Sequence, residues 1–244
     1  MSDATDSHAK GRLELPPLNQ TLKDDVLSFL HSQNLPQLYR GYEWQNDLWK
    51  TGFRDILKLE VSGRDSFRRA SLPKEFVLAV TEWGRLRNPG RVKYSSEIHF
   101  AEDSNPADLL LRIQNNVKGI GPTYQSKLIR FLMPAAAGAI DTRIVRVFGV
   151  GDSRSNKHQW LEVQVRNYGC GWYIPENQSA WPSGFYKWIG ILEYAANVLN
   201  KNKEARPHPK EFCVAGLRTE GIWTCADTQM AVFTYATKSI AKQL

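Results

Sequence analysis

The chain has 244 residues, a formal net charge of +7 at pH 7, eight Trp and three Cys. That length supports a buried core in one domain or in two small lobes. The three cysteines lack the spacing of a disulfide framework or a metal site. The polar first residues predict no signal peptide, and no segment approaches the roughly 20 apolar residues of a membrane span. We therefore expect a soluble intracellular protein without a metal or other cofactor.

The positive charge is concentrated in the middle of the chain. Residues 1–49 carry a net charge of −3, residues 50–150 carry +7, and residues 151–244 carry +3. A basic face suits a polyanionic partner, because phosphates neutralised by Lys and Arg release their counterions. On charge alone, a solvated face that keeps the protein soluble is an equally good interpretation.

Apolar spacing predicts a mainly α-helical chain with a flexible polar tail over residues 1–18 and one fold over residues 19–244. Thr21 and Asp24 have the spacing of a capping box that opens the first helix. A second helix is expected over residues 43–59, and Pro73 introduces a third. The stretch that follows, residues 85–103, contains Pro-Gly and predicts a loop or a short strand.

The second half of the chain contains one predicted β-hairpin among helices. Residues 161–174 alternate apolar and polar positions on both sides of Asn167-Tyr168-Gly169, as the two strands of a hairpin do. A strongly periodic helix follows Ser183. Residues 200–210 are polar and contain proline, which predicts a loop, and the last helix is expected over residues 226–241.

The stretch "DLLLRIQNNVKGIGPTYQSKLIRFL", residues 108–132, predicts two helices joined at a glycine turn. Gly119 and Gly121 permit positive φ and a close backbone approach, and Ile120 between them can anchor the turn in the core. Pro122 suits the first turn of the second helix, whose free N–H groups and positive end can bind a phosphate. An ordinary turn between two helices uses glycines as well, so this pattern alone is not specific.

The residues after this turn carry a resemblance to a known family. The sequence "GIGP" is followed by "IDTRIVRVFG" about 20 residues later, and the match spans some 30 residues from Gly119 to Phe148. This arrangement resembles the superfamily of helix-hairpin-helix DNA base-excision glycosylases, most closely its 8-oxoguanine DNA glycosylase (OGG) fold group. The resemblance implies that the hairpin grips DNA backbone phosphates without reading sequence. On this basis we expect a DNA contact from six further side chains or backbone groups beside the two glycines: Lys118, Ile120, Thr123, Lys127, Arg143 and Arg146.

By the same resemblance, Asp141 is the catalytic carboxylate. Cleavage of an N-glycosidic bond places positive charge on the sugar, and a fixed carboxylate can stabilise that charge and orient or deprotonate the attacking water. Asp141 also stands where a helix cap is expected, and capping alone would explain it. The two roles are compatible, since a carboxylate held by backbone N–H groups stays ionised.

The position of a nucleophilic lysine in bifunctional members of this family, two residues after the second glycine, is occupied by Thr123. The resemblance therefore implies a monofunctional enzyme that leaves an abasic site intact, and it makes lyase activity doubtful. Lys127 lies about one helical turn later and can either reach the site or contact a phosphate; we expect the phosphate contact. Three cysteines also exclude the four-cysteine iron–sulfur cluster of some relatives.

An extruded base requires aromatic surfaces and a few hydrogen-bonding groups. No motif maps these residues one by one, and core packing or ordinary capping is the more common reason for each candidate's position. The candidates for a base pocket are Trp44, Gln45, Trp181, Trp223, Asp227 and Gln229.

These observations predict a mainly α, two-lobed helix-hairpin-helix DNA glycosylase architecture with a small β-hairpin. Residues 105–150 would form the hairpin and catalytic segment, and the N- and C-terminal helices the second lobe. We expect a monomeric hydrolase of DNA repair, cytoplasmic or associated with the nucleoid, that flips a modified base out of double-stranded DNA. Oxidised guanine is favoured, while alkylated purines and hypermodified pyrimidines stay open, as do a non-catalytic DNA-binding module and a protein-binding helical scaffold.

Overall fold

The computed structural model describes residues 15–101, 103–169, 171–204, 207–209, 219 and 221–242. Over these residues the chain is mainly helical, as predicted, and its strands are only two residues long. None of the helices in this part of the chain is long and apolar enough to cross a membrane. The helices are α1 (Gln20–Ser32), α2 (Leu35–Arg40), α3 (Arg54–Arg68), α4 (Lys74–Trp83), α5 (Pro106–Asn116), α6 (Pro122–Leu132), α7 (Thr142–Phe148), α8 (Ser183–Lys201) and α9 (Cys225–Ala241), with short 3₁₀ helices η1 (Trp49–Thr51) and η2 (Pro89–Arg91).

The strands form antiparallel pairs, and two of these pairs join segments that are distant in the sequence. The pairs are β1 (Glu43–Trp44) with β2 (Asp47–Leu48), β3 (Ser71–Leu72) with β5 (Ile98–His99), β4 (Lys93–Tyr94) with β6 (Val117–Lys118), and β7 (Arg166–Asn167) with β8 (Trp172–Tyr173). Because β6 is the segment that joins α5 to α6, its pairing with β4 holds the loop before α5 against this connection.

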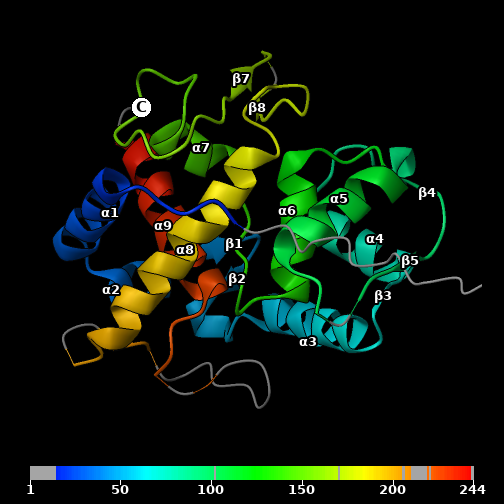
Figure 1. The fold of residues 1–244 in the computed structure, drawn as a ribbon, viewed down its shortest axis with the longest axis horizontal. Coiled ribbons are helices and arrows are strands. Elements are labelled where there is room, and N and C mark those ends of the chain that lie inside the picture. Colours follow the sequence, from blue (N-terminus) through cyan, green and yellow to red (C-terminus); the bar gives the residue numbers. More distant parts are fainter. Residues whose placement is uncertain are drawn as a thin grey trace, which may run out of the picture.

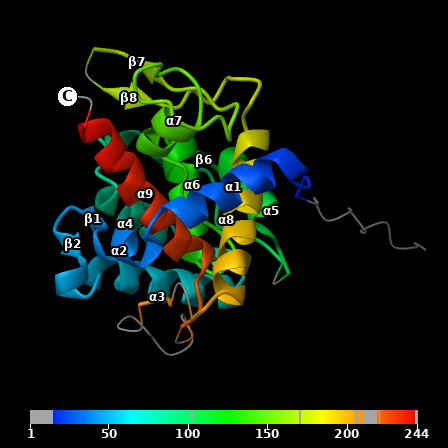
Figure 2. The same ribbon diagram turned by 90° about the vertical axis from the view of Figure 1, so that its left-hand side faces the viewer.

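The helices pack in two neighbouring groups (Figures 1 and 2). In one group α9 contacts α2, α7 and α8, and α1 lies against α8; in the other, α6 contacts α3, α4 and α5. The helices α3 and α6 approach closely at Gly63, where an added Cβ would lie 2.1 Å from the Phe131 carbonyl oxygen. A side chain at this position would therefore force the two helices apart.

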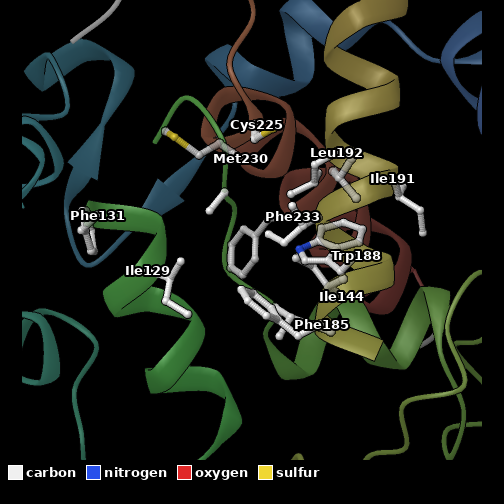
Figure 3. Packing of buried hydrophobic residues seen from close by; sticks show 14 of the residues in the cluster. Ile129, Phe131, Ile144, Phe185, Trp188, Ile191, Leu192, Cys225, Met230 and Phe233 are labelled. Atoms are coloured by element: carbon white, nitrogen blue, oxygen red, sulfur yellow. The ribbon is translucent and has the colours of Figure 1, made fainter. Parts of the chain in front are cut away.

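The core of the first group includes large apolar side chains of α7, α8 and α9, of which Ile144, Phe185 and Phe233 lie around Trp188 (Figure 3). Phe185 and Trp188 of α8 are fully buried, and Phe233 of α9 is 4% exposed. The indole N–H of Trp188 donates to the Ala139 carbonyl oxygen at 3.1 Å. This bond ties the segment before α7 to the core.

The prediction was least accurate in the N-terminal quarter of the fold. The first helix is capped by Asn19, which accepts from the Leu22 N–H, and not by Thr21. The prediction of a single helix over residues 43–59 is wrong. A β1–β2 hairpin turns at Gln45 and Asn46, both with positive φ, and α3 begins only at Arg54. Residues with left-handed backbone interrupt a helix, so one helix cannot run through Gln45 and Asn46. The carboxylate of Asp47 in the hairpin accepts from the Ile56 N–H in the first turn of α3.

The other predicted helices are confirmed with small shifts of their ends, whereas the predicted hairpin is confined to two-residue strands, with Asn167 in β7 and not in the turn. The helix after Pro73, the helix that begins at Pro106 and the two C-terminal helices are all present, and the predicted 161–174 hairpin is the shorter β7–β8 pair. The short helix α2 was not predicted, because its six residues carry too few apolar repeats. Residues 1–14 of the predicted tail and 205–206 and 210 of the predicted loop lie outside the described residues.

Candidate active site

The α5–α6 connection has the predicted glycine turn, but only one of its glycines needs a left-handed backbone. Gly119 has φ +83°, and a Cβ there would lie 2.2 Å from the Arg91 carbonyl oxygen. Gly121 is extended, with φ −98°, and caps α6. Ile120 is buried, as an anchor of the turn should be, while Lys118 is exposed and its Nζ donates to the Gln114 carbonyl oxygen at 2.7 Å.

Asp141 is the N-cap of α7. Its Oδ1 accepts from the Arg143 N–H at 2.8 Å and from the Ile144 N–H at 3.4 Å. Oδ2 has no hydrogen bond within the described part of the chain, and the side chain is 7% exposed. One carboxylate oxygen is thus fixed by the backbone, which leaves the other for a ligand or a water.

The segment before Asp141 is held against α6. The Ile140 N–H donates to Oγ of Ser126 at 3.1 Å, and this hydroxyl lies 3.0 Å from the Thr123 carbonyl oxygen. Since Lys127 follows Ser126 directly in α6, this contact fixes the position of Asp141 relative to Lys127.

A small cavity lies where α4, α6, α9 and the N-cap of α7 meet the β1–β2 hairpin. Its volume is about 10 Å³, which is close to the minimum of roughly 10–15 Å³ that one water needs. A nucleobase can enter it only if part of the wall moves. The lining residues are Tyr42, Trp44, Trp83, Lys127, Arg130, Ala139, Asp141, Gln229 and Phe233.

Lys127 lines this cavity and is not on the surface. A contact with a DNA phosphate would require a surface position, so the predicted phosphate contact of Lys127 is wrong. The side chain is 6% exposed, and its Nζ lies 4.6 Å from the ring centroid of Trp44, 5.4 Å from that of Trp83 and 5.1 Å from that of Tyr124. Burial lowers the pKa of Lys127 to about 8, against the opposing influence of Asp141, while Arg143 lowers it further. The amine is therefore neutral in a substantial fraction of molecules near pH 8.

Arg143 and Arg146, which were also predicted to contact DNA, are engaged within the protein as well. The guanidinium carbon of Arg143 lies 5.4 Å from the Trp44 ring centroid and 5.0 Å from that of Phe233, so it adjoins the cavity. Arg146 forms an ion pair with Asp152 at 2.6 Å and lies over the Trp172 ring. Thr123 is half-buried in the first turn of α6.

Arg130, one turn after Lys127, is a second buried cation. Its Nη1 lies 2.8 Å from Oε1 of Glu60 in α3, and both side chains are almost completely buried. An ion pair of this kind offsets the cost of burying a charge. Arg130 therefore forms part of the cavity wall and is not available to bind a phosphate.

The structure brings two of the six pocket candidates to the cavity. Trp44 and Gln229 line it. Gln45, half-buried in the β1–β2 turn, lines a different hollow, and Trp181 is buried against Phe185. The remaining two, Trp223 and Asp227, lie in a separate buried cluster with Tyr39 and His208.

Sequence reasoning missed several walls of the cavity. Three of the lining residues that were not predicted are Tyr42, Trp83 and Phe233. Their apolar spacing in the sequence indicates burial, but it does not distinguish a side chain that lines a cavity from one that is packed in the core. Burial raises the pKa of Tyr42 well above its ordinary value, and burial likewise raises that of Tyr124. Both phenols therefore stay protonated at neutral pH and can only donate or accept hydrogen bonds.

Comparisons of the chain with family models, with curated proteins and with solved structures gave no match. The resemblance to glycosylases thus depends on the residues and on the arrangement described above. Among the described residues, no group of three or more His, Cys, Asp and Glu side chains is placed to hold a metal ion.

Proposed function

We propose that this protein is a DNA glycosylase that extrudes a modified base from duplex DNA and hydrolyses its N-glycosidic bond at Asp141. The observation that carries the proposal is that Asp141 and Lys127 line one aromatic-walled cavity beside α6. Residues of both groups of helices line this cavity, which supports an arrangement of two lobes with a site between them. Ligand sites commonly lie between two packed units of this kind.

The chemistry follows from the two oxygens of Asp141. Oδ1 is held by two backbone N–H groups, so the carboxylate has a fixed orientation before the substrate binds. Oδ2 can then face the sugar, stabilise its oxocarbenium-like charge and take the proton of the attacking water. The bond to the base breaks with its electron pair going to the base, which acquires a proton, and an abasic sugar remains.

The extruded base would displace part of the cavity wall. Trp44 is the candidate for this displacement, because it is half-buried and stands on a hairpin with strands of only two residues. Its indole N–H donates to the Trp83 carbonyl oxygen at 3.0 Å, and this bond would have to break. Two-stranded hairpins of this length have little stability of their own. Once displaced, the indole can stack on the base, while Gln229 supplies hydrogen bonds to its edge.

Two contacts outside the cavity would position the DNA. The N–H groups at the start of α6 and the exposed Lys118 are suited to a backbone phosphate, since Gly121 carries no side chain to block the approach. Oxidised guanine is the favoured base by resemblance only.

The test is single-turnover excision on duplex oligonucleotides, each with one candidate modified base, read with and without alkali. Wild type is compared with Asp141→Asn and with Asp108→Asn, a matched control because Asp108 belongs to the capping box of α5 and does not line the cavity. Strand breaks that need alkali, disappear with Asp141→Asn and persist with Asp108→Asn support the proposal. Excision that persists with Asp141→Asn contradicts it.

A second candidate is a bifunctional glycosylase and lyase in which Lys127 attacks the sugar. It is favoured by the position of Nζ in the same cavity as Asp141 and by a pKa lowered to about 8. The amine would bond to C1′ as the base leaves with the electron pair and takes a proton from solvent. Asp141 would take a proton from Nζ, and opening of the sugar ring, with that proton passing to O4′, would give a protonated imine.

Borohydride distinguishes the two candidates, since it reduces such an imine to a stable amine that links enzyme and DNA. The bifunctional mechanism predicts a covalent complex that increases as pH rises through about 8 and is absent in Lys127→Gln. Excision without any trapped complex across this pH range leaves the monofunctional mechanism.

A further inference from the structure

The β7–β8 hairpin exposes aromatic side chains to solvent. Tyr168 in its turn is 71% exposed and Tyr173 is 37% exposed, with their ring centroids 5.7 Å apart. The other exposed large hydrophobic side chains of the described residues are the aliphatic Leu78, Leu111 and Val150. Exposed aromatic rings on one hairpin are typical of a surface that stacks on a partner.

The hairpin is held in place by contacts at its base. The ladder pairs Arg166 with Tyr173 and Asn167 with Trp172. The guanidinium of Arg146 lies 4.6 Å from the Trp172 ring centroid and is itself fixed by its ion pair with Asp152. These contacts fix the hairpin that carries the exposed tyrosine rings. Less conformational entropy is therefore lost when the rings bind a partner.

The hairpin also lies beside the candidate active site. Arg146, which lies over the Trp172 ring, follows Arg143 by about one turn in α7, and the guanidinium of Arg143 lies over the Trp44 ring of the cavity wall. In both views the hairpin forms one end of the molecule, next to α7, the helix that Asp141 caps (Figures 1 and 2).

The charge around the rings suits a nucleic acid. Arg166 on β7 is exposed, and the guanidinium of Arg87 lies close to the turn, 3.4 Å from where a Cβ on Gly171 would be. Aromatic rings near basic side chains are common in surfaces that stack on unpaired bases and hold the adjoining phosphates.

We propose that the β7–β8 hairpin is a DNA-contacting element in which Tyr168 stacks on the bases uncovered when one base leaves the duplex, while Arg166 holds a neighbouring phosphate. The inference rests on the proposed function, because it needs DNA as the partner. It adds a role for residues that hydrolysis at Asp141 does not require. A stacked ring occupies the gap left by the extruded base and so slows its return.

The experiment measures equilibrium binding by fluorescence anisotropy to two duplexes of one sequence, one intact and one with a tetrahydrofuran abasic analogue at its centre. The variants are Tyr168→Ala, Tyr168→Phe and, as a matched control on α5, Leu111→Ala. Stacking predicts that Tyr168→Ala weakens binding of the abasic duplex about tenfold and that of the intact duplex much less. Tyr168→Phe and Leu111→Ala should bind like wild type, because the first keeps the ring and the second lies elsewhere.

Arg166→Gln separates charge from stacking. It should reduce the salt dependence of binding by about one unit of slope on both duplexes, whereas Tyr168→Ala should leave the slope unchanged. Equal losses on both duplexes for Tyr168→Ala, or the same loss for Tyr168→Phe, would overturn the stacking role.

The binding assay needs no catalysis, so it separates this proposal from the proposed function. A protein that prefers the abasic duplex through Tyr168 but excises no base supports the hairpin and contradicts the glycosylase. Excision with no effect of Tyr168→Ala on binding contradicts the hairpin alone. Absence of DNA binding by the wild type overturns both.

Discussion

Two buried carboxylates, Asp141 and Asp227, differ in how completely the protein engages them. Asp227, in the first turn of α9, accepts from the Tyr39 hydroxyl at 2.9 Å and from the Thr224 hydroxyl at 2.7 Å, and His208 Nε2 lies 3.2 Å from its Oδ2. At Asp141, both hydrogen bonds end on Oδ1. Burial and a capping position are common to both, so neither marks a catalytic group. Only Asp141 lines a cavity and keeps one oxygen available for chemistry.

The largest expected effect is the loss of catalysis in Asp141→Asn. The amide cannot take a proton from water and carries no charge to stabilise the sugar, so single-turnover excision should fall about 10²–10⁴-fold. Duplex binding should remain within about twofold, since the variant keeps its size and its Oδ1. Rapid-quench kinetics and anisotropy measure the two quantities, and a parallel loss of both would identify Asp141 as a structural residue.

Asp227→Asn should give the opposite result. Replacing the carboxylate removes charge-assisted hydrogen bonds from a fully buried cluster, which should lower the free energy of unfolding by about 1–3 kcal/mol. Excision at a temperature where the variant is folded should be unchanged. Urea unfolding followed by far-UV circular dichroism measures the first quantity, and an excision rate reduced as strongly as that of Asp141→Asn would contradict the comparison.

Lys127→Met tests the unpaired cation beside Asp141. The pKa of Lys127 is lowered from 10.5 to about 8, so the unfolded chain binds more protons between these values and wild-type stability rises with pH across this window. Below pH 8 the folded protein must bury an ammonium. The variant should therefore be more stable than wild type at pH 7 by about 1–2 kcal/mol, with an advantage that shrinks toward pH 10.5.

Thermal unfolding at pH 7 and at pH 10 measures this difference. Lys127→Gln, of similar length but polar, is the control for the loss of charge without a gain in apolar packing. A destabilised Lys127→Met at pH 7 would mean that the contacts with Trp44, Trp83 and Tyr124 outweigh the cost of burial.

The smallest expected effect is that of Ser126→Ala, which removes the bond to the Ile140 N–H. Loss of this buried hydrogen bond should cost about 1 kcal/mol of stability. Because the bond positions Asp141, excision should slow several-fold while duplex binding is unchanged. Ser126→Thr, which keeps the hydroxyl, is the control. A change in binding alone would contradict the positioning role.

The sequence by itself determined those elements whose signals are local. Asn105 and Pro106 start α5, Gly119 allows the turn before α6, and Asp141 caps α7, because caps and turns depend on a few adjacent residues. The same local reasoning failed at residues 43–59. There the apolar residues have helical spacing, but left-handed Gln45 and Asn46 form a hairpin whose Asp47 caps α3 from a distance.

Only the tertiary structure decided which residues share the cavity. Lys127, Trp44 and Phe233 come from three distant segments, and no pattern in any one segment indicates that they meet. It also decided which charges face solvent. In the sequence, three basic residues near the glycine turn look equivalent. In the structure, Lys118 is exposed, Lys127 lies among aromatic rings and Arg130 forms an ion pair with Glu60. The physical reason is that burial and pairing depend on packing between elements, whereas caps and turns depend only on neighbours in the chain.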